Sequence, residues 1–108
     1  MVHYDIDFME SEIEIILGAF SYIKDDNDFI IEDNPYCSSE AINNVWNKIE
    51  SNYLKGDFNY YLSSNELTTL SIVLGDYNSI FTKSDKDYWH ICDICQRIYK
   101  VKASNRCK

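Results

Sequence analysis

The stretch SSNELTTLSIVLGDYNSIF, residues 63–81, carries the clearest helix signal in the chain. Ser63 and Glu66 have the spacing of a capping box, in which each side chain accepts a hydrogen bond from the other residue's backbone N–H. Beyond this box, apolar side chains recur every three or four residues, as along the buried stripe of an amphipathic helix. They are Leu67, Leu70, Val73, Leu74, Tyr77 and Phe81. The pattern predicts a helix that starts near Ser63 and buries one face.

Three other segments show the same helical period and predict three more helices. Residues 7–26 contain a second capping-box spacing at Ser11 and Glu14, although Asp7 is an alternative start. Residues 38–56 begin at Ser38 or Ser39 and end at Gly56, which suits the left-handed position after a helix. Residues 84–102 begin with Ser84 and Asp87 and become basic toward their end. The predicted buried stripes are Met9, Ile13, Ile16, Leu17, Phe20 and Ile23; Ile42, Val45, Trp46, Ile49 and Tyr53; and Tyr88, Ile91, Cys92, Cys95, Ile98 and Tyr99.

Two short segments between the predicted helices have strand character. They are DFIIED at residues 28–33 and DFNYYL at residues 57–62, and we expect any strand pairing to join these two. Residues 15–23 and 72–80 share an apolar pattern in which Gly18 and Gly75 align, which suggests two αα-hairpins with close helix contact at the glycines. The predicted fold is mainly α, one domain over residues 1–108, with four helices in two αα-hairpins and an optional small two-stranded β element.

The charge of the chain is negative and unevenly distributed. The net charge is −8; residues 1–82 hold 15 acids and three Lys (net −12), whereas residues 83–108 hold three acids and seven Lys or Arg (net +4). Such a surface opposes direct binding of nucleic-acid phosphates and favours a basic protein partner. The first ten residues, with His3 in a frayed terminus, lack a signal-peptide pattern, and no apolar run reaches the roughly 20 residues of a membrane span. We therefore expect a cytoplasmic protein without membrane contact.

The cysteines are the first candidates for chemistry. Cys92 and Cys95 form a C-x-x-C pair that could bind zinc together with Cys107 and either His90 or Cys37, or act as a redox pair. Because both lie on the apolar stripe of the predicted fourth helix, we interpret them as core residues, and a zinc-binding or redox protein stays an alternative. Residues 25–33 lack the glycine and ligand spacing of an EF-hand, and no catalytic fingerprint is present. We expect no catalytic residue, no metal and no cofactor.

Acidic and aromatic residues alternate in the first third of the chain and form the predicted partner-binding surface. Acidic groups speed the approach of a basic partner, and aromatic side chains among them act as anchors. The predicted binding residues are Glu10, Glu14, Tyr22, Asp25, Asp26, Asp28, Phe29, Glu32, Asp33 and Tyr36.

The segments SEIEIILGAFSYI (11–23) and SNELTTLSIVLGDYNSI (64–80), with their S-x-x-E-L and L-x-x-x-L-x-x-Y spacings, suggest a resemblance. They resemble the small acidic immunity proteins of bacterial contact-dependent growth inhibition and other polymorphic toxin systems. The resemblance implies a non-enzymatic inhibitor that binds a cognate basic toxin domain, often a nuclease, and masks its active site or substrate groove. An alternative with the same electrostatics is a phage anti-defence protein that mimics nucleic acid.

Overall fold

The computed structural model describes residues 3–24 and 29–106, except for the side chains of residues 105 and 106. The elements, in chain order, are β1 (His3–Asp7), α1 (Glu10–Lys24), α2 (Ser39–Leu54), β2 (Asn59–Ser63), α3 (Ser64–Asn78) and α4 (Lys86–Arg106). The two strands form one antiparallel sheet. The predicted mainly α fold with four helices and a small two-stranded element is confirmed.

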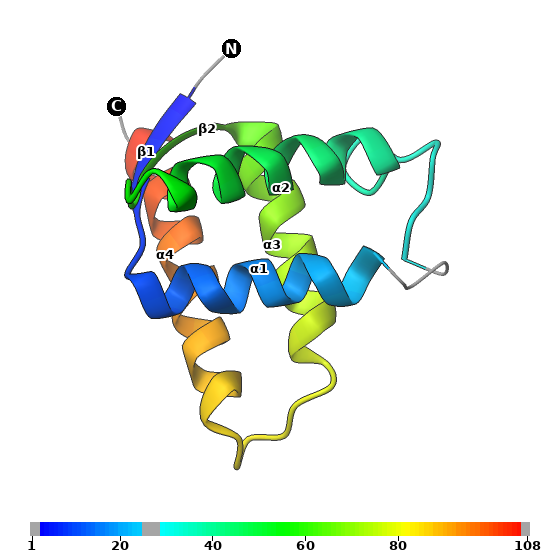
Figure 1. Ribbon diagram of the computed structural model, residues 1–108, viewed down its shortest axis with the longest axis vertical. Helices are drawn as coiled ribbons and strands as arrows, with labels where there is room; N and C mark the ends of the chain where they lie inside the picture. The colour runs from blue at the N-terminus through cyan, green and yellow to red at the C-terminus, as the bar shows by residue number, and fades with distance from the viewer. Residues whose placement is uncertain (1–2, 25–28, 107–108) are drawn as a thin grey trace.

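The four helices form two antiparallel hairpins that cross each other. Figure 1 shows α1 and α2 lying side by side in front, with α3 and α4 running across behind them. The small sheet lies at the corner where the start of the chain returns to the segment between α2 and α3. This arrangement confirms the two predicted αα-hairpins, and it brings the beginning of α1, the end of α2 and both strands to one end of the molecule.

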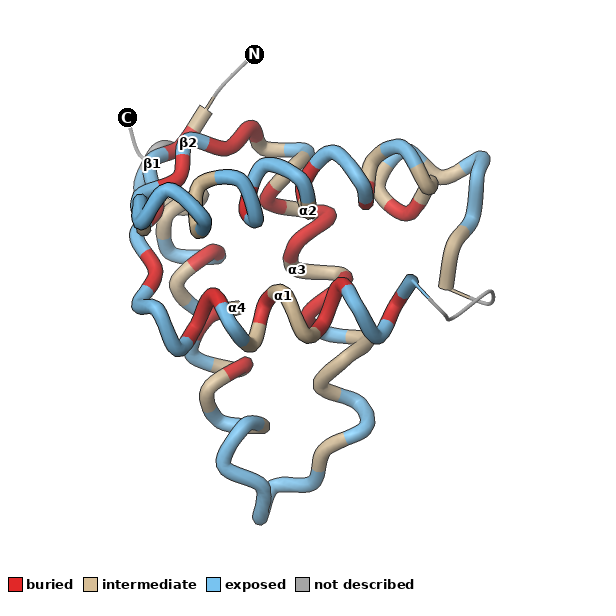
Figure 2. The backbone as a smooth tube through the Cα atoms, in the orientation of Figure 1, coloured by how far each residue is buried: buried red, intermediate tan, exposed pale blue. Residues whose placement is uncertain are grey.

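The core lies between the two hairpins, and buried and exposed positions alternate along the helices (Figure 2). Most predicted stripe positions are buried in it, including the central residues Phe20, Ile49 and Leu70. The prediction of burial is wrong for two side chains: Met9 is 60% exposed and Tyr99 is 74% exposed. Met9 precedes the first turn of α1, and the buried line of α4 runs through Ile91, Ile94 and Ile98, which turns Tyr99 toward solvent.

The predicted pairing of residues 28–33 with residues 57–62 is wrong. β2 does form where DFNYYL was predicted as a strand, but it pairs with β1, with Tyr4 opposite Leu62 and Ile6 opposite Tyr60. Residues 29–33 form no strand, and residue 28 lies outside the described residues. His3, predicted to be frayed, belongs to β1, and its ring stacks on Tyr61 with ring centroids 4.8 Å apart.

Helices α2 and α3 begin as predicted, and α2 also ends as predicted, just before Gly56, whereas α3 ends at Asn78, three residues before Phe81 of its predicted stripe. The Ser63–Glu66 capping box is present, with Ser63 N–H donating to Glu66 Oε1 at 2.8 Å and Glu66 N–H donating to Ser63 Oγ at 3.1 Å. Ser38 caps α2 by accepting the N–H of Ala41 at 3.2 Å. Gly56 follows α2 with φ +77°, the left-handed conformation that favours glycine. These local signals therefore predicted both helix starts and the end of α2 correctly.

The starts of α1 and α4 differ from the prediction. At α1, Glu12 reaches back to the N–H of Met9 at 2.8 Å, so the predicted Ser11–Glu14 capping box is wrong. α4 begins at Lys86, two residues after the predicted Ser84. At both helix starts a carboxylate accepts the backbone N–H of the residue three positions earlier. At α1 the pair is Met9 and Glu12, and just before α4 it is Thr82 and Asp85.

Replacing Gly75 by alanine should raise the free energy of unfolding by about 0.5–1 kcal/mol, because alanine has the higher helix propensity. The predicted close contact between helices is absent at this position: Gly75 is exposed, and an added Cβ would meet nothing within 4 Å. At Gly18 the nearest atom is the Tyr77 hydroxyl at 3.6 Å, an ordinary contact. Urea unfolding measures the effect. Gly56→Ala, at positive φ, is the control that should destabilise; a loss of stability in Gly75→Ala would contradict the expectation.

Candidate functional site

The two cysteines of the C-x-x-C pair lie on one face of α4 beside the core. Cys95 packs against the apolar core, and Cys92 Sγ accepts a hydrogen bond from the side-chain amide of Asn78 at 3.6 Å. Cys37 is buried in the turn before α2, and Cys107 lies outside the described residues. Within residues 3–24 and 29–106, no three His, Cys, Asp or Glu side chains come together in a way that would hold a metal ion.

The thiol of Cys95 should react slowly with iodoacetamide. Burial, and to a smaller extent the charge of the neighbouring Cys92, raise the pKa of Cys95 to about 11. Because the thiolate is the reactive form, alkylation near pH 8 should be roughly a hundredfold slower than for a cysteine in a short peptide. Mass spectrometry of a Cys92→Ala variant follows the site without interference from its neighbour. Alkylation of Cys95 at the rate of the peptide would show that the thiol is not shielded by the core.

The predicted partner-binding residues that the structure describes do not form one surface. Glu10 and Glu14 are exposed in the first half of α1, whereas Tyr22 lies near its other end, with its ring against that of Tyr77. A helix rises about 1.5 Å per residue, so the two ends of α1 are about 20 Å apart. Asp33, also exposed, lies in the segment that leads into α2, beyond the far end of α1 (Figure 1).

The other predicted binding residues either lie near the far end of α1 or are not among the described residues. Glu32 accepts hydrogen bonds from the N–H and the hydroxyl of Ser39 at 2.8 and 2.7 Å, and these bonds lower its pKa. Phe29 packs against the core, and the N–H of Tyr36 donates to Asn34 Oδ1 at 2.8 Å. Asp25, Asp26 and Asp28 lie outside the described residues. The binding role of the whole set stays a prediction, and the far end already uses Glu32 to hold the start of α2.

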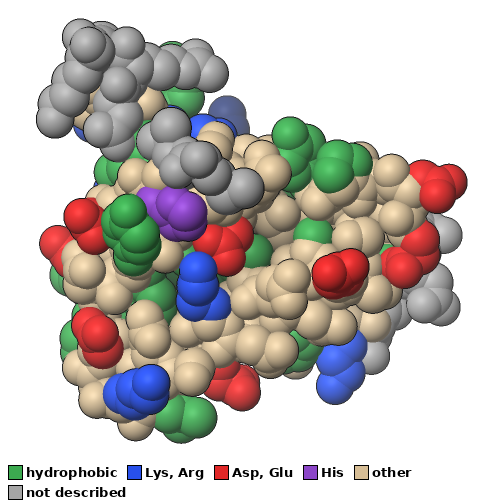
Figure 3. Space-filling view, turned by 90° about the horizontal axis from the view of Figure 1, so that it is seen from above, with side chains coloured by type: hydrophobic (Ala, Val, Ile, Leu, Met, Phe, Trp, Pro, Cys, Tyr) green, Lys and Arg blue, Asp and Glu red, His purple; other side chains and the backbone are tan. Residues whose placement is uncertain are grey.

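Exposed acidic side chains lie where α1 begins and α2 ends, because the Phe8 N–H bonds the Phe58 carbonyl there and both Glu10 and Glu14 act on Tyr53 near the end of α2. We call this set the acidic corner: Asp7, Glu10, Glu14 and Asp57. Asp7 Oδ1 accepts the side-chain amide of Asn59 at 2.6 Å, and Glu14 Oε1 accepts the hydroxyl of Tyr53 at 3.3 Å. Partial burial, then Glu14 and then Glu10, raise the pKa of Tyr53. In Figure 3 acidic side chains are visible at both ends of the face and also between them.

Two exposed apolar side chains adjoin the acidic corner. Met9 directly precedes Glu10 and is 60% exposed, and Leu54 ends α2 directly after Tyr53 and is 77% exposed. The sequence interpretation overlooked Asp7, Asp57, Met9 and Leu54 as binding candidates. The corner therefore combines negative charge with accessible apolar surface, which is the composition of a protein-binding site with steering charges and anchors.

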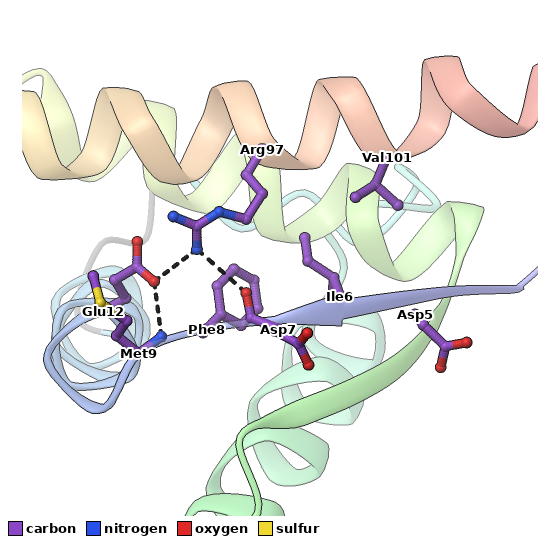
Figure 4. A pocket seen from close by; sticks show the side chains of 8 residues that line it. All are labelled: Asp5, Ile6, Asp7, Phe8, Met9, Glu12, Arg97 and Val101. Carbon is purple, nitrogen blue, oxygen red and sulfur yellow. Dashed lines mark hydrogen bonds and ion pairs between the residues drawn. The ribbon is translucent and has the colours of Figure 1, made fainter.

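A groove of about 470 Å³, the β1 groove, lies beside the acidic corner between β1, the start of α1 and α4 (Figure 4). Its floor holds an ion pair: Arg97 Nη1 lies 2.6 Å from Glu12 Oε1 and donates to the Asp7 carbonyl at 3.2 Å. Glu12 is only 3% exposed. Burial acts to raise the pKa of Glu12, but the hydrogen bonds from Arg97 and Met9 and the charge of Arg97 together lower it. The pair is therefore ionised and joins α4 to the start of α1.

Comparison with known proteins adds no relative. No family model matches the chain, and neither a curated protein nor a solved structure matches it. In the described part of the chain, none of the helices combines the length and the apolar character that crossing a membrane requires.

Proposed function

We propose that this protein is an immunity protein that binds and neutralises a cognate basic toxin domain, a nuclease, in the cytoplasm. It acts as an inhibitor without catalysis of its own and requires no cofactor. The acidic corner is the observation that carries the proposal, because it places four carboxylates beside two exposed apolar side chains. The net charge of −12 over residues 1–82 supports the same reading.

The proposed mechanism is occlusion of the toxin. A nuclease binds phosphates through Lys and Arg in its substrate groove. The carboxylates of the acidic corner take the place of those phosphates, and the long-range attraction between opposite charges accelerates the encounter. Met9 and Leu54 then bury apolar surface against the toxin, which slows dissociation.

Co-expression with a basic protein encoded by a neighbouring reading frame, where one is found, tests the proposal. We expect the neighbouring protein alone to arrest growth and co-expression of this chain to restore it. A Cys92→Ser, Cys95→Ser double variant should restore growth equally well, since the proposed mechanism uses no thiol or zinc. Persistent growth arrest in the presence of this chain would refute the immunity role, and failure of the cysteine variant alone would favour the zinc-binding or redox alternative.

A further inference from the structure

The outer edge of β2 is closed by side chains of this protein. Glu66 accepts the N–H of Ser63 at 2.8 Å, and the Lys48 ammonium donates to the carbonyl of Tyr61 at 3.4 Å. Asp57 accepts the N–H of Asn59 at 3.1 Å. With these partners in place, the edge offers few free backbone groups to another strand.

The outer edge of β1 is different. The N–H of Phe8 donates to the carbonyl of Phe58 at 3.0 Å, so the even-numbered residues of β1 direct their backbone groups toward β2. The backbone groups of Asp5 and Asp7 therefore point away from the sheet. Arg97 bonds the Asp7 carbonyl, but in the described part of the chain no hydrogen bond engages the N–H or the carbonyl of Asp5, or the N–H of Asp7.

The β1 groove runs along this open edge and has two chemically distinct sides. In Figure 4 the side chains of Ile6 and Phe8 point toward α4, while those of Asp5 and Asp7 point away from it. Val101 projects from α4 toward the strand. A strand added here would have one face over apolar side chains and the other face beside two exposed carboxylates.

We propose that the β1 edge receives an extended segment of the protein partner as a third strand of the sheet. The segment alternates apolar residues with Lys or Arg. Its backbone pairs with the outward N–H and carbonyl of Asp5 and the N–H of Asp7, its apolar side chains cover Val101, and its basic side chains stand opposite the two carboxylates. The identity of the partner rests on the proposed function; the groove specifies how that partner binds.

Charge favours a basic segment over a second copy of this chain. Two β1 strands paired antiparallel along their outer edges would bring Asp5 opposite Asp5 when the strands are fully aligned, and Asp5 opposite Asp7 when they are shifted by two residues. Like charges directly opposite each other destabilise a strand pair, whereas Lys or Arg at the same positions stabilises it. Acidic residues on an edge are also a common protection against self-association.

A peptide of alternating Lys and Val, added to the isotope-labelled full chain, tests the proposal. We expect the peptide to slow hydrogen exchange of the Asp5 and Asp7 amides by about tenfold or more, because these amides become part of a sheet. The same peptide with N-methyl groups on alternate residues keeps its charge and side chains but cannot form the ladder, so it should bind about tenfold or more weakly.

Two substitutions at one position separate backbone pairing from charge. Asp5→Pro removes an N–H that points away from β2, a position where an edge strand tolerates proline, and should weaken peptide binding by about tenfold or more. Asp5→Ala keeps the N–H and loses only the charge, so its effect should be smaller and should vanish at high salt. Equal binding of the N-methylated peptide would overturn the proposal, whether or not the proline variant folds.

Two further outcomes separate this inference from the proposed function. If Asp5→Pro, folded as shown by its amide spectrum, neutralises the toxin as well as the unaltered chain does, strand addition is refuted while the immunity role stands. If the peptide binds as expected but the chain fails to restore growth, the β1 edge stands and the immunity role is refuted. A dimer of the unaltered chain in sedimentation that Asp5→Pro abolishes would overturn the choice of partner in favour of a second copy.

Discussion

Replacing Phe20 by alanine should lower the free energy of unfolding by about 4 kcal/mol, because removing a large buried side chain loses its transfer free energy and leaves a cavity. Phe20 is 0% exposed and lies where α1 packs against the rest of the core. Its ring stacks on Trp46 of α2 with ring centroids 5.9 Å apart. Urea unfolding monitored by tryptophan fluorescence measures the loss.

Tyr22→Ala on the same helix is the control for the Phe20 substitution. Tyr22 is 40% exposed and touches Tyr77 with its ring, so its removal should cost less than about 1 kcal/mol. The two substitutions change helix propensity in a similar way, so the difference between them reports burial. Equal costs for the two variants would mean that α1 does not present the face that contains Phe20 to the core.

Replacing Arg97 by alanine should lower the free energy of unfolding by about 2 kcal/mol near pH 7, by leaving the buried Glu12 carboxylate without its cation. Breaking a fully buried pair costs more, but the side chain of Arg97 is 36% exposed, so water hydrates the site in part. Arg97→Lys should cost less than Arg97→Ala, because lysine keeps the positive charge and loses only the hydrogen bond to the Asp7 carbonyl.

The cost of Arg97→Ala should depend on pH in a defined direction. The folded chain holds the pKa of Glu12 below its ordinary value of 4.5, so the pair contributes stability above that value, and the contribution fades as pH falls through the lowered pKa. In the variant, burial without the cation raises the pKa of Glu12, and its protonated form needs no partner. The difference from the unaltered chain should therefore shrink from about pH 7 toward pH 4.

A double-substitution cycle identifies the pair as the cause. Glu12→Gln combined with Arg97→Ala should cost less than the sum of the two single substitutions, because the double variant leaves no buried charge behind. Additive costs, or a cost of Arg97→Ala that stays constant as pH falls, would show that Arg97 stabilises the fold only through packing.

The helices could be predicted because their signals are local. The apolar period marked all four, and short-range caps such as Ser63 with Glu66 marked where two of them begin. The strand that pairs with β2 could not be predicted in the same way, because strand pairing joins distant segments. The sequence holds two segments with strand character that could pair with β2, residues 3–7 and residues 28–33. The β-branched residues Ile30 and Ile31 predicted a strand at residues 28–33. The alternation of buried Tyr4 and Ile6 with exposed Asp5 was the better strand signal.

The candidate site was harder to predict because the fold assembles it from distant residues. Acids that are neighbours in sequence are spread along the length of α1. Asp57 comes to the start of α1 because the segment after α2 returns there, where the Phe8 N–H bonds the Phe58 carbonyl. Glu12 resembled its acidic neighbours in the sequence, yet it is buried against an arginine 85 residues away. One local signal did point to it: Glu12 lies on the same face of α1 as Ile16 and Ile23.

The docking role of the acidic corner is tested most directly by the association rate with the toxin domain, measured against salt concentration. Glu10→Lys, Glu14→Lys and Asp57→Lys together should slow association by about tenfold or more and flatten its dependence on salt. The matched control is Glu40→Lys, Asp87→Lys and Asp93→Lys, three exposed acids outside the corner and outside the predicted binding set. It makes the same change in net charge and should stay within about threefold of the unaltered chain. Equal slowing by both triple variants, or by neither, would contradict docking through the acidic corner.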